Sequence, residues 1–462
     1  MENKGQITVF LSLILISLLG LFWAASDIVG IYMNKARVAE AARGASLHIE
    51  ADYQREVFDR YHLLLLDKNY MGSGEGKVEE KIWDYLDYTL SEYGFSINDI
   101  CLANTRSVLA DNCYDLKKQI DEYMTLYFEK QTLEKVKKEL QAGDMAADSI
   151  GEEIHKGKTE EAEQEGTWQG EDPRKLLNKE MKKGLLNIVL PEGKGVSRTD
   201  VSLQNIPSVQ LKEPDASEDI DISFSNIDRL EADLGKVSMT DHSAVEENIN
   251  SILYAMECFG NYMEDKKDDC IFQCEVEYLI GGKNNDYDNL ACVINKIILH
   301  RLPMNMAVLL ADAEKMAEIS SMAATLALIP GVTYGAAKYL LAACISYGET
   351  ILEIRTLLAG KKIPLVKKST DWKLDLTNIG KLSDMDTESY EGIDGIDYES
   401  FLMLLLAEHT DQLYYRMCDL IQLNIGLKQE DFRIADCIDA FTVDLDIAKG
   451  RRKYDMSVSA VY

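Results

Sequence analysis

The side chains that most often do chemistry form no recognisable catalytic motif in this 462-residue chain. The six histidines lie far apart, and the sequence contains no HExxH, GxSxG or GxxxxGKS/T motif and no GxGxxG motif after a predicted strand. His48 with Glu50, and His409 with Glu408, fall within predicted helices, where solvent-facing or hydrogen-bonded histidines are the usual case. We therefore predict that the protein is not an enzyme and has no catalytic residues and no cofactor. A hydrolase whose catalytic groups meet only in the fold is the enzymatic alternative.

The nine cysteines could bind a metal or form disulfides, but their spacing favours buried thiols. Cys270 and Cys274 make the tightest pair, and no second tight pair or supporting histidine completes a zinc site. A local disulfide there, or a bridge between Cys101 and Cys113, stays open if the body lies outside the cytoplasm.

Two acidic clusters carry the oxygen ligands that calcium prefers. Their residues are Asn284, Asp286 and Asp288 in the first, and Asp384, Asp386 and Glu388 in the second. The second cluster lacks the glycine that turns an EF-hand loop and the glutamate that closes it. Solvated loops are the simpler interpretation of both clusters, so we predict no metal site, and the sequence does not decide whether either binds calcium.

The composition indicates a folded protein and excludes one class of partner. With 46% hydrophobic and 28% charged residues, the chain is large enough for two or three globular units. Its formal charge of −30 argues against nucleic acid as a partner and would repel an anionic lipid leaflet.

The N-terminal sequence is the strongest indication of where this body is placed, because residues 5–26 include no charged side chain. At about 1.5 Å per residue, a helix of this length crosses the roughly 30 Å hydrocarbon core of a bilayer. A cleaved signal peptide is the nearest alternative, since Ala24, Ala25 and Ser26 are small enough for a peptidase site. The apolar run is longer than that of a usual signal peptide, so we predict a retained, single-pass anchor in the cell membrane, with the lipid bilayer as a partner.

An amphipathic continuation follows the anchor. Residues 28–61 contain no proline and many alanines, so one helix can run through them. Apolar residues recur there at spacings of three and four and form one stripe on the helix. The stripe consists of Val38, Ala42, Ala45, Ile49 and Tyr53. We predict that this stripe packs against other helices and supports a homo- or hetero-oligomer through the N-terminal helix.

The next part of the chain is predicted to be helical and then irregular. Residues 78–95 and 113–140 have helical spacing. From residue 143 to about residue 173 the pattern disappears and acidic residues accumulate. A short helical patch follows at about residues 174–190, and a second irregular run continues to about residue 241. This composition is typical of a solvated, partly disordered linker or insertion.

A second body begins near residue 243. Residues 272–280 alternate as a strand would. The uncharged run at residues 319–337 is interrupted by Pro330 and Gly331, so a hairpin of two buried helices is favoured over a second membrane span. Residues 398–425 read as one long apolar helix. Helical spacing is also found in residues 244–263, 286–300 and 304–329.

The C-terminal residues change to the period of a strand. Residues 441–447 and 454–462 alternate on either side of Gly450, which predicts an antiparallel hairpin. The predicted strand at residues 272–280 is its expected partner, since an isolated hairpin is only marginally stable.

The predicted fold class is therefore α+β and predominantly α. A long N-terminal transmembrane and amphipathic helix is followed by helical bodies with a small antiparallel sheet that includes the C-terminal hairpin. We divide the chain into an anchor with its amphipathic helix (1–61), a helical region (62–142), an acidic linker or insertion (143–241) and an α+β body (242–462).

The N-terminal sequence resembles the TadE/TadG-like proteins of tight-adherence (Flp-type) pilus systems. The resemblance is carried by a very short leader, Gly5-Gln6, an uncharged helix and the alanine-rich ARVAEAARGAS. The whole chain more closely resembles a Gram-positive family of single-anchor proteins of unassigned function that is found with such systems. The matching segments are KGQITVFLSLIL, DRYHLLLLD, EVEYLIGGKNNDYDNL, LLAGKKIPLVKKSTDW and IDYESFLMLLL.

The resemblance implies a cytoplasmic N-terminus and an extracellular body. Basic residues alone favour the opposite orientation, since more of them follow the span than precede it. Pilin-like precursors are usually cut after a glycine, which implies leader processing between Gly5 and Gln6. They carry glutamate at the fifth mature position, where this chain has Phe10, so the resemblance favours a minor over a major pilus subunit.

We therefore expect a membrane-anchored, extracytoplasmic structural or assembly component of a Tad-like surface pilus, minor and pilin-like. Its expected partners are other pilus-system membrane proteins. The alternative from another class is a cell-envelope binding or sensory ectodomain, in which the acidic body recognises a cation or a wall polymer.

Overall fold

The chain packs as two compact units. Unit 1 comprises residues 1–119 and 425–462, and unit 2 comprises residues 120–424. The computed structural model describes all residues except 1–2, 71–72, 75, 126–132, 160, 162–169, 211–221, 223, 225, 235–247, 330, 386–394 and 409. The predominantly helical α+β class is confirmed, with a long apolar N-terminal helix and a small antiparallel sheet. The four segments into which we divided the sequence stay a prediction.

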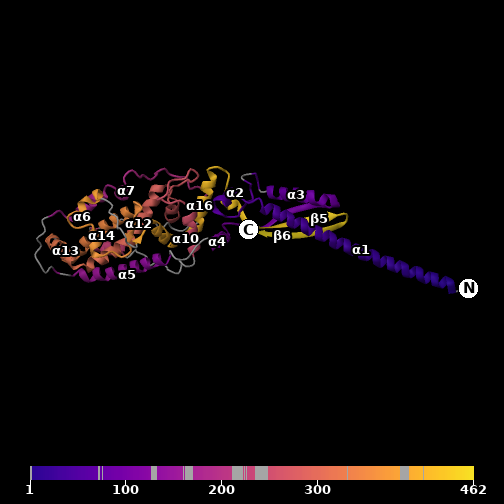
Figure 1. Cartoon of the computed structure of the whole chain (residues 1–462), viewed down its shortest axis with the longest axis horizontal. Helices are drawn as coiled ribbons and strands as arrows, with labels where there is room; N and C mark the ends of the chain where they lie inside the picture. The colour runs from indigo at the N-terminus through magenta and orange to yellow at the C-terminus, as the bar shows by residue number, and fades with distance from the viewer. Residues whose placement is uncertain are drawn as a thin grey trace. The chain divides into compact units, whose positions relative to one another are not determined.

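Unit 1 combines a long helix with an antiparallel sheet (Figure 1). Strand β5 is central and pairs antiparallel with β1, β2 and β6. The predicted C-terminal hairpin is confirmed, because Lys449 pairs with Arg452 around a turn in which Gly450 has φ +62°. The elements are α1 (Asn3–Glu50), α2 (Arg55–Tyr61), β1 (Leu66–Asp67), α3 (Lys77–Leu90), η1 (Ser91–Tyr93), β2 (Ser96–Ser107), η5 (Ile434–Asp436), β5 (Cys437–Lys449) and β6 (Arg452–Val461).

The core of unit 1 lies between the second half of α1, helix α3 and the sheet. Alternate residues of β5 are buried, as expected for a strand with one face on a core. Helix α3 contributes Val78, Ile82 and Leu86, which recur every four residues on one helical face.

Two expectations for unit 1 are wrong. The predicted helix over residues 28–61 ends at Glu50, and α2 follows after a turn in which the Gln54 N–H donates to the Leu65 carbonyl (2.7 Å). Strand β2 lies in a region predicted to be helical. Its residues are mostly exposed or half-buried, so its sequence lacks the alternating apolar pattern that would have indicated a strand.

Most of the regular elements described in unit 2 are helices, and α14 runs through its centre with nearly every residue buried. Helix α4 (Ala110–Thr125) contains the boundary between residues 119 and 120. The other elements are α5 (Leu133–Gly157), α6 (Pro173–Met181), α7 (Leu185–Val189), η2 (Pro207–Gln210), α8 (Ile227–Leu234), α10 (Ile249–Cys258), α11 (Glu275–Gly281), α12 (Asp286–Ala311), α13 (Ala313–Leu326), α14 (Tyr334–Leu358), β3 (Ile363–Pro364), η3 (Ser369–Asp371), η4 (Ile379–Asp384), β4 (Gly395–Ile396), α15 (Tyr398–Ala407) and α16 (Thr410–Gly426).

The predicted helical hairpin is confirmed, because α13 and α14 pack against each other on either side of Gly331. The predicted strand at residues 272–280 is wrong: residues 275–281 form α11 and are all buried, so the alternation of polar and apolar residues marks buried carboxylates rather than a solvent face. The long helix expected at residues 398–425 is two helices, α15 and α16. The loss of pattern expected after residue 143 begins later, because α5 continues to Gly157 and buries Ile150 and Ile154, which lie four residues apart.

Candidate functional site

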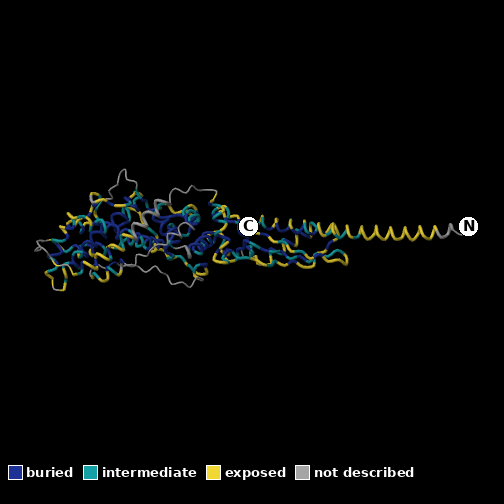
Figure 2. The backbone as a smooth tube through the Cα atoms, turned by 90° about the horizontal axis from the view of Figure 1, so that it is seen from below, coloured by how far each residue is buried: buried dark blue, intermediate teal, exposed yellow. Residues whose placement is uncertain are grey.

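The first half of α1 is an apolar surface that the described residues of unit 1 leave exposed. In the part of the chain that the structure describes, two helices are long and apolar enough to cross a membrane. One is α12, which is largely buried in unit 2, and the other is α1 from Ile7 onward, whose most apolar part is entirely exposed (Figure 2). Phe22 and Trp23 are each 75% exposed. A long exposed apolar helix near the N-terminus is consistent with a membrane anchor.

The second half of the same helix is part of a folded core. Figure 1 shows α3 and the β5–β6 hairpin beside this half of α1. The transition is marked by polar contacts: Arg452 forms an ion pair with Asp27 (2.5 Å), Lys449 donates to Asn34 Oδ1 (3.2 Å), and Asn34 donates to the Tyr454 hydroxyl (3.2 Å). The exposed apolar residues and the residues packed in the core of unit 1 therefore belong to one uninterrupted helix, with no linker between them.

The predicted packing stripe lies inside unit 1. Val38, Ala42, Ala45 and Ile49 are buried between α1, α3 and the sheet. Tyr53 lies beyond the end of α1, where its ring makes an edge contact with Phe58 (centroids 5.1 Å apart). The stripe therefore packs against its own unit, and the surface of α1 left for other helices is the exposed part before residue 34.

The residues of the predicted leader site, Gly5 and Gln6, lie in the first turns of α1. Cleavage between them stays a prediction.

The first predicted acidic cluster is part of a helix start. Asp286 is buried and accepts a hydrogen bond from the Cys274 N–H (2.9 Å). Asn285 caps α12 by accepting from the Asp288 N–H (2.8 Å). The described residues contain no group of three or more potential metal ligands, whereas Asp386 and Glu388 of the second cluster lie outside them.

The structure shows the surroundings of the cysteines and of the histidines that the sequence analysis considered. The nine cysteines all lie in the described part of the chain and no disulfide joins them; Cys101 is exposed and Cys113 is buried. His48 stacks on Tyr85 (centroids 5.4 Å apart), and His409 lies outside the described residues. A pairing that the sequence did not reveal joins His300 Nε2 to Glu408 Oε1 (2.9 Å).

Sequence reasoning also missed two clusters of buried charge in unit 2. The first centres on α11, which belongs to the segment EVEYLIGGKNNDYDNL. Glu275 accepts hydrogen bonds from the Gly260 N–H (3.0 Å) and from Asn424 (2.5 Å). Glu277 accepts from the Tyr262 N–H (2.9 Å) and from the Tyr398 hydroxyl (2.8 Å), all through Oε1. These carboxylates hold loop backbone and a second helix against α11, which explains charged residues inside a buried helix.

Burial raises the pKa of the Glu277 carboxyl from 4.5 to about 7, although the hydrogen bonds from Tyr262 and Tyr398 act in the opposite direction. Its second oxygen has no hydrogen-bond partner among the described residues. Between these two pKa values, folded unit 2 holds a proton that the unfolded chain has lost. The free energy of unfolding therefore falls as the pH rises through this interval.

We predict that Glu277→Gln removes this loss. The variant stays neutral at every pH, so its stability relative to the wild type should rise between about pH 5 and pH 8 by on the order of 3 kcal/mol. Thermal unfolding, monitored by hydrogen exchange of unit 2 peptides, measures the difference in stability between the variant and the wild type. Glu264→Gln, which removes an exposed carboxylate in the same unit, is the control. A constant difference between Glu277→Gln and wild type across this range would contradict the prediction.

The second cluster joins α12, α14 and the segment LLAGKKIPLVKKSTDW. Arg301 makes a bidentate ion pair with Glu353 (Nε 3.0 Å, Nη2 2.9 Å) and donates to the Leu365 carbonyl (2.9 Å). Lys367 Nζ lies 3.1 Å from Glu353 and also pairs with Glu349. All four charged side chains are at most 1% exposed. Burial alone would raise the pKa of Glu353, but the charges of Arg301 and Lys367 outweigh it and lower the pKa to about 2.

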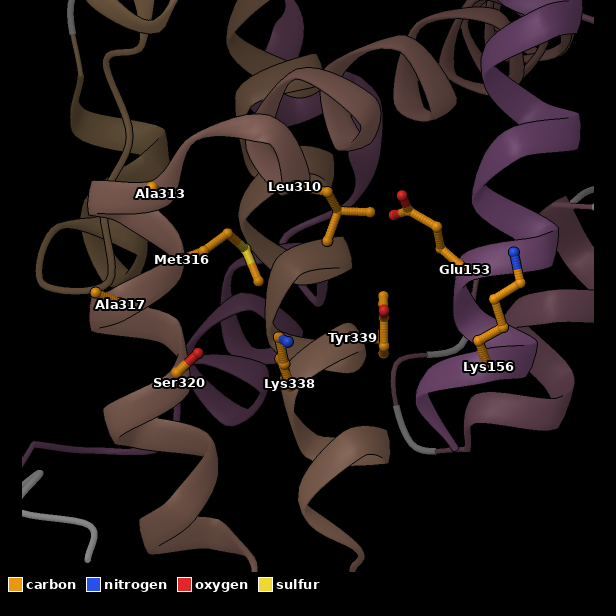
Figure 3. Close-up of a pocket in the computed structure, with 9 residues that line it drawn as sticks. All are labelled: Glu153, Lys156, Leu310, Ala313, Met316, Ala317, Ser320, Lys338 and Tyr339. Atoms are coloured by element: carbon orange, nitrogen blue, oxygen red, sulfur yellow. The ribbon is translucent and has the colours of Figure 1, made fainter. Parts of the chain in front are cut away.

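A surface pocket of about 490 Å³ opens in unit 2 between α5, α12, α13 and α14 (Figure 3). Its lining mixes charged, hydroxyl and apolar side chains. The residues are Glu153, Lys156, Leu310, Ala313, Met316, Ala317, Ser320, Lys338 and Tyr339.

Residues 163–449, more than half of the chain, match a family described as a family of unknown function (DUF5702). The matched residues include most of unit 2 and strand β5, and they begin after α1. No curated protein and no solved structure matches the chain.

Proposed function

The chain belongs to the DUF5702 family, and we propose that it is a membrane-anchored structural or assembly component of a Tad-like surface pilus. In this proposal α1 crosses the cell membrane once, its N-terminus is cytoplasmic, and both units lie outside the cell. The protein is a minor, pilin-like, non-catalytic subunit that binds other membrane proteins of the pilus system.

The observation that carries the proposal is the continuity of α1. An exposed apolar half and a packed half belong to one 48-residue helix, and the packed half is held by α3 and the sheet. A signal peptide or a flexible tether needs no such rigid connection, whereas a subunit that positions a body against neighbouring membrane helices does. The resemblance of residues 1–46 to TadE/TadG-like proteins gives the pilus context and the orientation.

The exposed part of α1 is the surface that the proposed partners would bind. Because Ala42, Ala45 and Ile49 are buried in unit 1, partner helices in the bilayer meet residues 7–33 instead. Small residues allow close approach of two helices in lipid, and this segment offers Gly20 and Ala24, which lie four residues apart on one face.

Exchange of the membrane helix tests the proposal. We predict that replacing residues 7–26 with a polyleucine helix of equal length keeps the protein in the membrane but abolishes recovery of pilus-system proteins in a pull-down from mild detergent. The reason is that polyleucine preserves hydrophobic length and removes the shaped surface.

As a control, amide hydrogen exchange of the two folded units is measured in the polyleucine variant and in the wild type. It should be the same in both proteins. Retention of every partner after the exchange would contradict the proposal and would favour a cell-envelope binding or sensory ectodomain, which needs the anchor only for attachment.

A further inference from the structure

The turn of the β5–β6 hairpin brings basic side chains to the point where the apolar surface of α1 ends. Arg452 contacts Asp27, which is the first charged residue after the apolar run, and Lys449 contacts Asn34 two turns later. Arg451 and Lys453 flank Arg452 and are exposed, and Lys35 is exposed on α1 itself. These five side chains, Lys35, Lys449, Arg451, Arg452 and Lys453, are called the basic collar below.

We propose that the basic collar binds the acidic headgroups of membrane lipids and so seats unit 1 on the bilayer surface. The inference rests on the proposed anchoring of α1 in a membrane, and it adds a second, electrostatic contact that none of the anchor residues supplies.

The depth of the collar follows from the length of the apolar run. Residues 7–26 span about 30 Å as a helix, which matches the hydrocarbon core. The headgroup region extends roughly 5–8 Å further on each side, equivalent to about four or five helical residues after residue 26. Arg452, held at Asp27, therefore lies at headgroup depth. The exposed rings of Trp23 and Tyr32 lie on either side of this level, as aromatic residues at a membrane interface commonly do.

The charge of the collar is only partly neutralised within the protein. Asp27 pairs with Arg452, and Asp446 lies 3.2 Å from Lys453. No ion pair of Arg451 or Lys35 with an acidic side chain is found among the described residues. Lysine and arginine keep their stems on apolar surface while the charged end reaches phosphate, so this arrangement suits a headgroup layer.

The acidity of the whole chain does not oppose this contact. Charges separated by more than about 8 Å are largely screened at physiological ionic strength. Unit 1 extends away from the collar along α1, where residues 27–50 alone cover about 35 Å. Within unit 1, charges that lie further from the collar than this distance therefore have little effect on its contact with the headgroups.

Lysine footprinting of the full chain in bilayers tests the proposal. The protein is reconstituted in phosphatidylcholine alone or with phosphatidylglycerol added, and acetylation by an activated ester is followed by mass spectrometry. We expect Lys35 and Lys453 to react about fivefold more slowly with phosphatidylglycerol present, and high salt should abolish the difference. Lys428, an exposed lysine in unit 1 beside Gln429, which bonds Gln54 beyond the end of α1, should react at one rate throughout.

Two matched variants assign the effect to the collar. Arg451→Gln and Arg55→Gln each remove one exposed arginine from unit 1, the first at the hairpin turn and the second in α2. Only Arg451→Gln should weaken the protection of Lys453. Equal rates in both bilayers, or equal protection by inorganic phosphate without acidic lipid, would overturn the proposal. Flotation with phosphatidylcholine vesicles reports the anchor separately, so the collar can fail while anchoring and the pilus role stand.

Discussion

Replacing Arg301 with methionine is expected to destabilise unit 2 by about 3–5 kcal/mol. The substitution leaves Glu353, which is fully buried, with Lys367 as its remaining cationic neighbour, and it removes two of the hydrogen bonds that satisfy its oxygens. It also leaves the Leu365 carbonyl without the guanidinium donor. A loss of this size is comparable to the whole stability of many domains. Hydrogen exchange of peptides from α12 and α14 measures it while unit 1 serves as an internal reference.

Two further variants make the Arg301 result interpretable. Arg229→Met removes an exposed arginine from α8 of the same unit and should change stability by less than about 0.5 kcal/mol. The double variant Arg301→Met with Glu353→Gln should lose much less than the sum of the two single losses, since no unpaired carboxylate remains. Additive losses would show that the pair contributes no coupling, contrary to the geometry.

Ile49→Asp is the second change with a large expected effect, and it should unfold unit 1. Ile49 is 0% exposed, so the substitution loses about 2 kcal/mol of apolar burial and places a carboxylate within the hydrophobic core cluster of unit 1. Leu47→Asp is the matched control, because Leu47 lies two residues earlier in α1 and is 61% exposed. Proteolysis and hydrogen exchange of β5 and α3 should change sharply for Ile49→Asp and little for Leu47→Asp.

Similar effects of the two aspartate substitutions would contradict the placement of α1 on its own sheet. These two variants also show why the pull-down experiment replaces residues 7–26 rather than the stripe. A polar substitution in the stripe would unfold unit 1, so a loss of partner binding would not identify an interface.

The sequence predicts the elements whose pattern depends on one buried face or on length. The apolar run of α1, the helix α3 and the β5–β6 hairpin are recovered from spacing alone, because each element has one consistent apolar period. The stripe on α1 is also recovered as a packing surface. Its partner is not, because spacing indicates that a face is buried but not by what.

The missed features depend on contacts between distant residues. Strand β2 has few buried side chains, and its pairing with β5 joins residues such as Ser96 and Ala448, which lie 352 residues apart. The error at α11 has a different cause, since Glu275 and Glu277 look like the outer face of a strand until Gly260, Tyr262 and Tyr398 are seen to satisfy them. The basic collar could not be predicted from the sequence either, because residues near 27 and 452 are brought together only by the fold.

The central position of β5 determines the order in which the protein can mature. The ribosome makes α1, α2, β1, α3 and β2 first, then unit 2, and only afterwards β5 and β6, which complete the sheet beside α1. Unit 2 is contiguous in the chain and can fold while translation continues, as autonomous domains generally do. The buried face of α1, by contrast, is not yet covered by β5 and β6 during that time. The apolar residues that precede this face have already left the ribosome. If α1 enters the membrane as proposed, its insertion precedes completion of unit 1, and the nascent chain has to keep this face from aggregating until residues 437–461 arrive.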